Sequence, residues 1–167
     1  MSTHVAVNTY TYSVTYLSDK IVHSLKEIIR ETGLDPAKFA GNWESTQNGI
    51  STWLKSRHLN SVHLEVFSIA TDKLVLRWDL EVVYDAPDGD GSMWVDTDDL
   101  CYAIRKAGQS PGSCDYRVVV NTRNGRPDVA GWSTCSFRST VDFSRHSIGT
   151  MIGARNGLAS SAAYWSA

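Results

Sequence analysis

The first third of the chain passes from a period of two residues to the period of a helix. Residues 1–8 are small, polar and unpatterned, which predicts a tail. Residues 9–16 alternate β-forming side chains with polar ones, which predicts a strand. A helix is predicted next, capped by Ser18 or Asp19 and ended by Gly33. Its apolar stripe consists of Ile21, Val22, Leu25, Ile28 and Ile29.

A second amphipathic pattern lies between Pro36 and Lys55 and predicts another helix. Gly41 and Gly49 disfavour this helix, because glycine costs more backbone entropy than other residues when it becomes helical. The residues that share one face are Trp43, Gln47, Ile50, Trp53 and Leu54.

The middle of the chain returns to a period of two and predicts a long hairpin. Its first strand begins at Val62, and a turn at residues 70–72 leads into the second strand, residues 74–84. The side chains expected to be buried are Val62, Leu64, Val66, Leu74, Leu76, Trp78, Leu80, Val82 and Tyr84. The other face carries Val75, Arg77, Asp79 and Glu81, which predicts an antiparallel sheet with helices on one side and solvent on the other.

Two further elements complete the predicted body. Residues 85–96 form a loop rich in Gly, Asp and Pro, and Asp96 or Thr97 caps a helix that runs to about Lys106. Residues 114–122 have the density of β-branched side chains that suits a central strand.

The C-terminal segment has no apolar pattern sufficient for a core of its own. Residues 123–128 predict a turn or loop. Short β-like pieces follow at 132–138, 148–152 and 162–165, separated by Gly, Ser, Asn and Arg. Because exposed backbone groups need partners, we expect this segment to lie on the sheet or to be partly mobile.

Composition places these elements in one folded domain. The chain has 167 residues, 42% hydrophobic and 20% charged, which is enough apolar area for a single core. The formal net charge of -2 argues against a generally basic nucleic-acid surface. Three cysteines fit neither a disulfide framework nor metal knuckles. We find no signal peptide or membrane span, so we expect a cytoplasmic protein without membrane partners.

The residues that can carry chemistry do not form a recognised catalytic motif. The acidic residues of 85–99 could ligate a hard cation, but their spacing fits no calcium loop. The five histidines lack a metalloprotease motif, no serine lies in a nucleophile elbow, and no glycine run fits a nucleotide loop. We therefore expect no enzyme, no metal and no cofactor. A divalent-cation enzyme that depends on Asp96 and Asp98 is the weaker alternative.

Basic and aromatic side chains alternate in the last quarter of the chain. The residues are Arg123, Arg126, Arg138, Arg145 and Arg155, with Trp132, Phe137, Phe143 and Trp165. This mixture can bind single-stranded nucleic acid, or it can anchor a peptide that adds to a sheet edge. We favour the peptide and expect no nucleic acid to be bound by this chain alone. A nucleic-acid-binding module remains the alternative function.

The chain resembles the bacterial HORMA-domain proteins of CBASS antiphage signalling operons. The resemblance covers most of the chain and is carried by YTYSVTYLSDK (10–20), GISTWLKS (49–56), LRWDLEVVY (76–84), WVDTD (94–98), YRVVV (116–120) and GRPDVAGWS (125–133). It implies an α+β fold with three helices packed on an antiparallel or mixed β-sheet. It also implies a C-terminal safety belt that traps an extended closure peptide.

On this resemblance the single domain 1–167 divides into a tail at 1–8, a core at 9–122 and a safety belt at 123–167. The resemblance further implies that the closed, peptide-bound form binds and activates a cGAS/DncV-like nucleotidyltransferase. An AAA+ remodelling ATPase would reopen the domain from its N-terminus. The peptide contacts that we expect are Val118, Val120 and Thr122 on the sheet, and Trp132, Phe137 and Trp165 as belt clamps.

Overall fold

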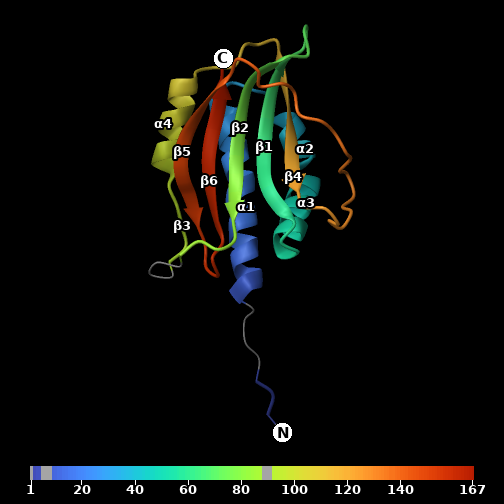
Figure 1. Ribbon diagram of the computed structural model, residues 1–167, viewed down its shortest axis with the longest axis vertical. Coiled ribbons are helices and arrows are strands. Elements are labelled where there is room, and N and C mark those ends of the chain that lie inside the picture. The colour runs from blue at the N-terminus through green and yellow to red at the C-terminus, as the bar shows by residue number, and fades with distance from the viewer. Residues whose placement is uncertain (1, 5–8, 88–91) are drawn as a thin grey trace.

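A computed structural model describes residues 2–4, 9–87 and 92–167 of the chain as one sheet with helices on one face (Figure 1). The predicted tail lies largely outside these residues, and 2–4 have no regular structure. No described helix is long and apolar enough to cross a membrane. The helices are α1 (Thr9–Glu31), α2 (Ala37–Gly41), α3 (Trp43–Lys55) and α4 (Thr97–Ala107). The strands are β1 (Leu59–Ser68), β2 (Leu74–Val83), β3 (Trp94–Val95), β4 (Cys114–Thr122), β5 (Ser144–Gly153) and β6 (Ala159–Ser166).

Helix α1 shows that the strand predicted at residues 9–16 is wrong, since those residues are its first turns. Val14 and Leu17 continue the helical stripe of Ile21 backwards, and all three side chains are buried. The Thr and Tyr residues between them have high β propensity, but burial of this stripe outweighs it. The predicted end is confirmed, because Gly33 has a φ of 83° and the next N–H, of Leu34, bonds to the Ile29 carbonyl at 3.0 Å.

The second predicted helix is two helices, with the break at Asn42. Helix α2 has only five residues, and α3 carries the predicted stripe, in which Ile50, Trp53 and Leu54 are fully buried. The helix predicted after residues 85–96 is confirmed as α4. The Asp96 carboxylate accepts the N–H groups of Asp98 and Asp99, at 3.1 and 3.2 Å. The predicted loop before it contains the short strand β3.

The six strands form one sheet in the order β3-β5-β6-β2-β1-β4, and every strand pair among the described residues is antiparallel. The predicted hairpin is confirmed as β1 and β2, with Leu64 opposite Trp78. The prediction of a central strand at 114–122 is wrong, because β4 lies at the edge of the sheet. Val118 and Val120 pack against the core from this edge, whereas Val119 lies opposite His63 on the other face.

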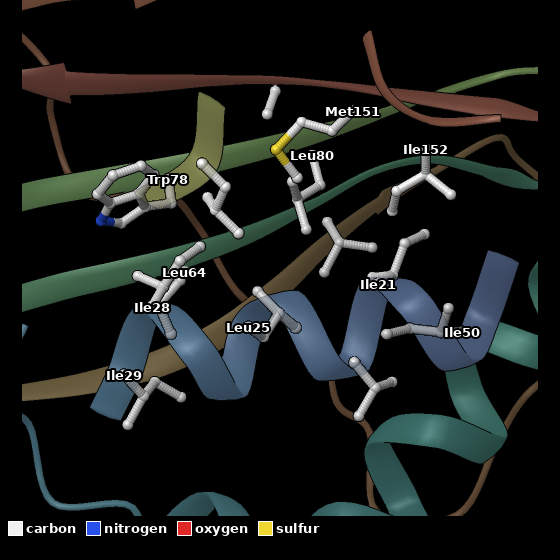
Figure 2. Close-up of a cluster of buried hydrophobic side chains, with 14 of the residues drawn as sticks. Ile21, Leu25, Ile28, Ile29, Ile50, Leu64, Trp78, Leu80, Met151 and Ile152 are labelled. Carbon is white, nitrogen blue, oxygen red and sulfur yellow. The ribbon is translucent and has the colours of Figure 1, made fainter. Parts of the chain in front are cut away.

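The hydrophobic core lies between α1 and the sheet (Figure 2). Ile21, Leu25 and Ile28 project from α1 toward the strands, where Leu64 and Leu80 meet them. The C-terminal strands add Met151 and Ile152 to this core, and both are fully buried. Burial of this apolar surface is the main force that holds the helices on the sheet.

The opposite face of the sheet is less solvated than the sequence predicts. His63, Glu65 and Asp79 point to that face, and each is at most 6% exposed. Part of their cover is the segment 123–143, which has no helix or strand and passes outside β4 before it crosses to β5 (Figure 1). We call this segment the strap. Of the three β-like pieces predicted after residue 128, those at 148–152 and 162–165 lie in β5 and β6, whereas 132–138 belongs to the strap and is not a strand.

Candidate functional site

The outer edge of β4 presents backbone groups that no other described strand pairs with. Tyr116 shows which residues point outward, because its carbonyl accepts the Lys38 ammonium at 2.7 Å and its N–H bonds to the Asp115 carboxylate at 2.8 Å. Alternate residues of a strand direct both backbone groups to the same side. The N–H and C=O groups of Val118 and Val120 therefore also point away from β1.

The first half of the strap rests on helix α3. The indole N–H of Trp53 donates to the Pro127 carbonyl at 2.7 Å. The indole N–H of Trp132 donates to the Ser45 carbonyl at 2.8 Å, and its ring meets Trp53 edge-on with centroids 5.1 Å apart. These contacts hold residues 127–132 beside α3.

Two arginines hold the second half of the strap on the outer face of the sheet. The backbone N–H of Arg138 donates to Glu65 at 2.7 Å, and its guanidinium reaches Glu65 at 3.0 Å and Asp72 at 2.8 Å. Arg117 of β4 binds the same Glu65 at 2.6 Å and also donates to the Ser136 carbonyl. Glu65 is fully buried, so these two guanidinium groups compensate its charge.

Between these two attachments lies a groove of about 250 Å³, bounded by the β4 edge, α2, α3 and the strap. Its lining residues are Lys38, Phe39, Asn42, Ser45, Thr46, Tyr116, Arg117, Val118, Gly131 and Trp132. The groove therefore contains outward backbone groups on one wall and apolar or small polar side chains on the other. This arrangement suits an extended chain, which needs both kinds of contact.

Gly49 explains how Trp132 comes to lie against α3. A Cβ at position 49 would collide with the Trp132 indole. Gly49, which disfavours the helix by its low propensity, thus leaves the space in which the Trp132 indole packs. The sequence carried this signal as an unexplained glycine within an apolar stripe.

The structure divides the six predicted peptide contacts between two places. Val118, Val120 and Thr122 lie half-buried on the edge strand. Trp132 lines the groove with Val118. Phe137 and Trp165 lie on the outer face of the sheet, where both rings flank the Arg77 guanidinium at 5.1 and 5.2 Å. The roles of all six as peptide contacts stay predictions.

A buried polar chain on that outer face was missed by the sequence analysis. Ser61 Oγ lies 2.7 Å from His63 Nε2, and His63 Nδ1 lies 2.6 Å from Asp79 Oδ1. Burial alone would raise the pKa of Asp79, but hydrogen bonds from His63, Arg77 and Trp165 outweigh it and lower the pKa. The order Ser, His, Asp resembles a hydrolase triad. However, Ser61 is only 7% exposed, and the Phe137 ring packs edge-on against the His63 imidazole at 4.8 Å, so these three side chains form a buried polar cluster against which Phe137 packs.

The charges at one end of the groove are Lys38 and Asp115, which form an ion pair of 3.1 Å. Burial alone would raise the pKa of Asp115, but the N–H of Tyr116 and the Lys38 ammonium outweigh it and lower the pKa. Lys38 therefore contacts both a carboxylate and a strand-edge carbonyl.

The arginines proposed to bind nucleic acid are engaged within the protein. Arg138 binds Glu65 and Asp72 as described, and Arg145 lies 3.5 Å from Glu81. Arg126 packs over the Trp53 ring at 5.1 Å, and Arg123 over Tyr84 at 5.5 Å. These contacts direct the four guanidinium groups to partners within the protein.

The acidic run is only partly covered by the structure. Asp88 and Asp90 lie outside the described residues. Asp96 caps α4, and its charge is the main reason that the pKa of Asp99 is raised. Within the described part of the chain, no three His, Cys, Asp or Glu residues are grouped so that they could hold a metal ion.

Comparisons with known proteins agree on the fold. A family model described as bacterial HORMA domain 2 matches residues 2–167. A chain of the mitotic checkpoint complex superposes with a TM-score of 0.74 at 10% identity, covering 92% of this chain and 98% of that one. C. elegans HTP-1 bound to HTP-3 motif-1 gives 0.67 at 12%, covering 92% and 89%. A chain of the E. coli MS115-1 HORMA:CdnC:Trip13 complex gives 0.60 at 9%, covering 98% and 95%. No curated protein sequence matches.

Proposed function

The chain belongs to the bacterial HORMA domain 2 family, and from this premise we propose that it is a switch operated by an extended closure peptide. The predicted resemblance to bacterial HORMA domains and the predicted α+β HORMA fold are both confirmed. In the proposal, the peptide adds as a strand to the free edge of β4 and the strap holds it there. The fold neighbour HTP-1 is bound to a motif of HTP-3, which supports a peptide ligand.

The observation that carries this proposal is the open edge of β4 beneath the strap. An unpaired strand edge attracts another strand, since its N–H and C=O groups gain partners when one adds. Val118 and Val120 offer these groups next to the groove, and the strap is attached on both sides of it. A bound strand would therefore be paired on one side and covered on the other.

We propose that residues 123–167 act as the safety belt and that the strap is the part that encloses the peptide. A peptide that binds one arrangement of the belt shifts the population toward it by its differential affinity. A change from 1:99 to 99:1 requires about 5.5 kcal/mol of preference. A paired strand with a few buried side chains can supply this amount.

The output of the switch, in this proposal, is a protein partner. The closed form binds and activates a cGAS/DncV-like nucleotidyltransferase in antiphage defence, and an AAA+ ATPase reopens it from the N-terminus. Support comes from the fold neighbour that occurs in a complex with CdnC and Trip13. The chain itself then needs no catalytic residue, only two arrangements that its partners distinguish.

The peptide proposal is tested by panning the full chain against a phage-displayed library of random nonapeptides. We expect extended peptides to be recovered. Their binding should slow amide exchange at Val118 and Val120, as measured by NMR. Val118→Pro should reduce affinity more than about tenfold, because it removes an N–H that points outward and does not pair with β1.

Val118→Ala is the matched control, since it shortens the same side chain and keeps the N–H. It should bind the recovered peptides within about threefold of wild type. Equal affinities for the proline and alanine variants would show that the peptide does not pair with β4. A library that yields no peptide would remove the proposal altogether.

A further inference from the structure

The Lys38 ammonium occupies a hydrogen-bonding site on the edge of β4 that an added strand would need. Its ammonium donates to the Tyr116 carbonyl at 2.7 Å, and that carbonyl points outward from the sheet edge. The lysine belongs to the short helix α2, and its ammonium lies 5.3 Å from the centre of the Tyr116 ring. A strand that pairs with β4 at Tyr116 places its own N–H on this carbonyl and its own C=O on the Tyr116 N–H. It therefore displaces the Lys38 ammonium from the carbonyl and the Asp115 carboxylate from the N–H.

The displaced ammonium keeps only part of its present coordination. Asp115 remains as a partner at 3.1 Å, while the bond to the Tyr116 carbonyl is lost. The lysine side chain is about half exposed before binding, at 47%, and an added strand would cover it further. A half-covered cation that loses an acceptor gains from a new carboxylate beside it.

Strand geometry fixes which peptide residue lies beside Lys38. Residues directly opposite one another on paired strands project to the same face. Tyr116 and Val118 pair with Val66 and Leu64, which point to the core, so both side chains project toward the helices. The peptide residue opposite Tyr116 therefore projects toward Lys38.

The peptide residue opposite Val118 meets a different environment. It lies two positions away on the same face of the groove, whose other lining residues include Phe39, Thr46 and Trp132. Phe39 is buried, and Trp132 is fixed by its bond to the Ser45 carbonyl. This part of the groove suits an apolar side chain.

On the basis of the proposed function, we infer that the groove selects peptides with an acidic residue two positions from an apolar one. The acidic side chain pairs with Lys38 and the apolar one packs between Phe39 and Trp132. The residue between them projects to the other face of the sheet, on the side of Arg117. The same spacing holds for either direction of the peptide.

The test uses peptides recovered by panning the full chain, made with Glu, Gln or Lys at the position opposite Tyr116. For the wild-type chain we expect Glu to bind about fivefold more tightly than Gln, and Lys more weakly than both. Lys38→Met keeps the aliphatic stem and should make Glu and Gln equal. Lys38→Glu should reverse the order, so that the Lys peptide binds best.

The outcomes separate this inference from the proposal on which it rests. Peptides that bind wild type regardless of charge at this position would overturn the inference and leave peptide binding intact. The inference also fails if Lys38→Met keeps the preference for Glu over Gln. If panning yields no peptide, both statements fail together. Circular dichroism of each variant confirms that the fold is retained before affinities are compared.

Discussion

The strap and the hairpin formed by β5 and β6, which we call the terminal hairpin, follow one another in sequence. They are nevertheless held in different ways. Strands β5 and β6 pair with each other, β6 pairs with β2 from Leu76 to Val83, and the hairpin buries Met151 and Ile152 in the core. The strap has no helix or strand, and each of its residues is at least partly exposed. It is held by hydrogen bonds and ring contacts around Trp132, Phe137 and Arg138.

This difference shows how one C-terminal segment can both complete the fold and move. Removal of the hairpin would expose apolar core surface, which is the costliest change for a small domain. Release of the strap exposes the aromatic rings that it covers or contributes, chiefly those of Trp53, Trp132 and Phe137, and hydrates Glu65, but it leaves the core between α1 and the sheet covered. We therefore expect the strap to open at much lower free energy than the rest of the chain.

The largest expected effect on stability comes from a core residue of the terminal hairpin. Ile152→Ala should lower the free energy of unfolding by about 2–5 kcal/mol, because it leaves a cavity in the core beside α1. Val141→Ala in the strap truncates a side chain that is 74% exposed. It should change the free energy of unfolding by less than about 0.5 kcal/mol. Urea denaturation of both variants measures the contrast. Similar losses for the two would mean that the hairpin is not part of the core.

An intermediate effect is expected when Arg138 of the strap is replaced. Arg138→Met keeps much of the aliphatic stem but removes the guanidinium contacts to Glu65 and Asp72, so strap closure should weaken by about 1.5–3 kcal/mol. Hydrogen exchange followed by mass spectrometry should show faster exchange in residues 130–143 and unchanged protection in β5 and β6.

Arg145→Met is the matched control for this variant. Its partner Glu81 is half exposed, and the pair is longer, at 3.5 Å, so the effect should stay below about 1 kcal/mol. The contrast between strap and hairpin fails if Arg138→Met speeds exchange equally in both regions, since the two would then open as one unit.

The sequence predicted the elements whose pattern is local. The stripe of α3, the capping residue Asp96 and the β1–β2 hairpin depend on neighbours a few positions away, and they were found. The first turns of α1 were not found, because a Thr and Tyr alternation fits a strand until Val14 and Leu17 are counted with the later stripe. The edge position of β4 depends on which strands pair, and no local pattern encodes that.

The candidate site was predictable only in its strand half. Val118 and Val120 followed from a β-branched strand, whatever its neighbours. The seat of Trp132 on Gly49 joins residues 83 positions apart, and the contact of Arg138 with Glu65 joins residues 73 apart. Such pairings are set by the path of the strap, which has no periodicity to read.

The smallest expected effect concerns the pH dependence of stability. It depends on the buried pair of His63 and Asp79, which contacts both the strap and the terminal hairpin. Asp79 accepts a bond from Trp165 of the hairpin at 2.8 Å, and its partner His63 carries the strap residue Phe137. The pKa of Asp79 is lower in the folded chain than its ordinary value of 3.8. Between these two pKa values the unfolded chain binds more protons than the folded chain. The contribution of Asp79 to the free energy of unfolding is therefore complete above about pH 4 and declines as the pH falls through the pKa of the folded state.

Thermal unfolding between about pH 2 and 6 measures this contribution. Asp79→Asn should be less stable at neutral pH, and its stability should depend less on pH below 4, by at most about 1.4 kcal/mol per pH unit. The Asp79 carboxylate contacts the hairpin side chain Trp165 directly and the strap residue Phe137 only through His63. Because the strap is expected to open at lower free energy than the hairpin, acid should loosen the strap before the hairpin. Hydrogen exchange near pH 3 would contradict this order if β6 lost protection before residues 136–138.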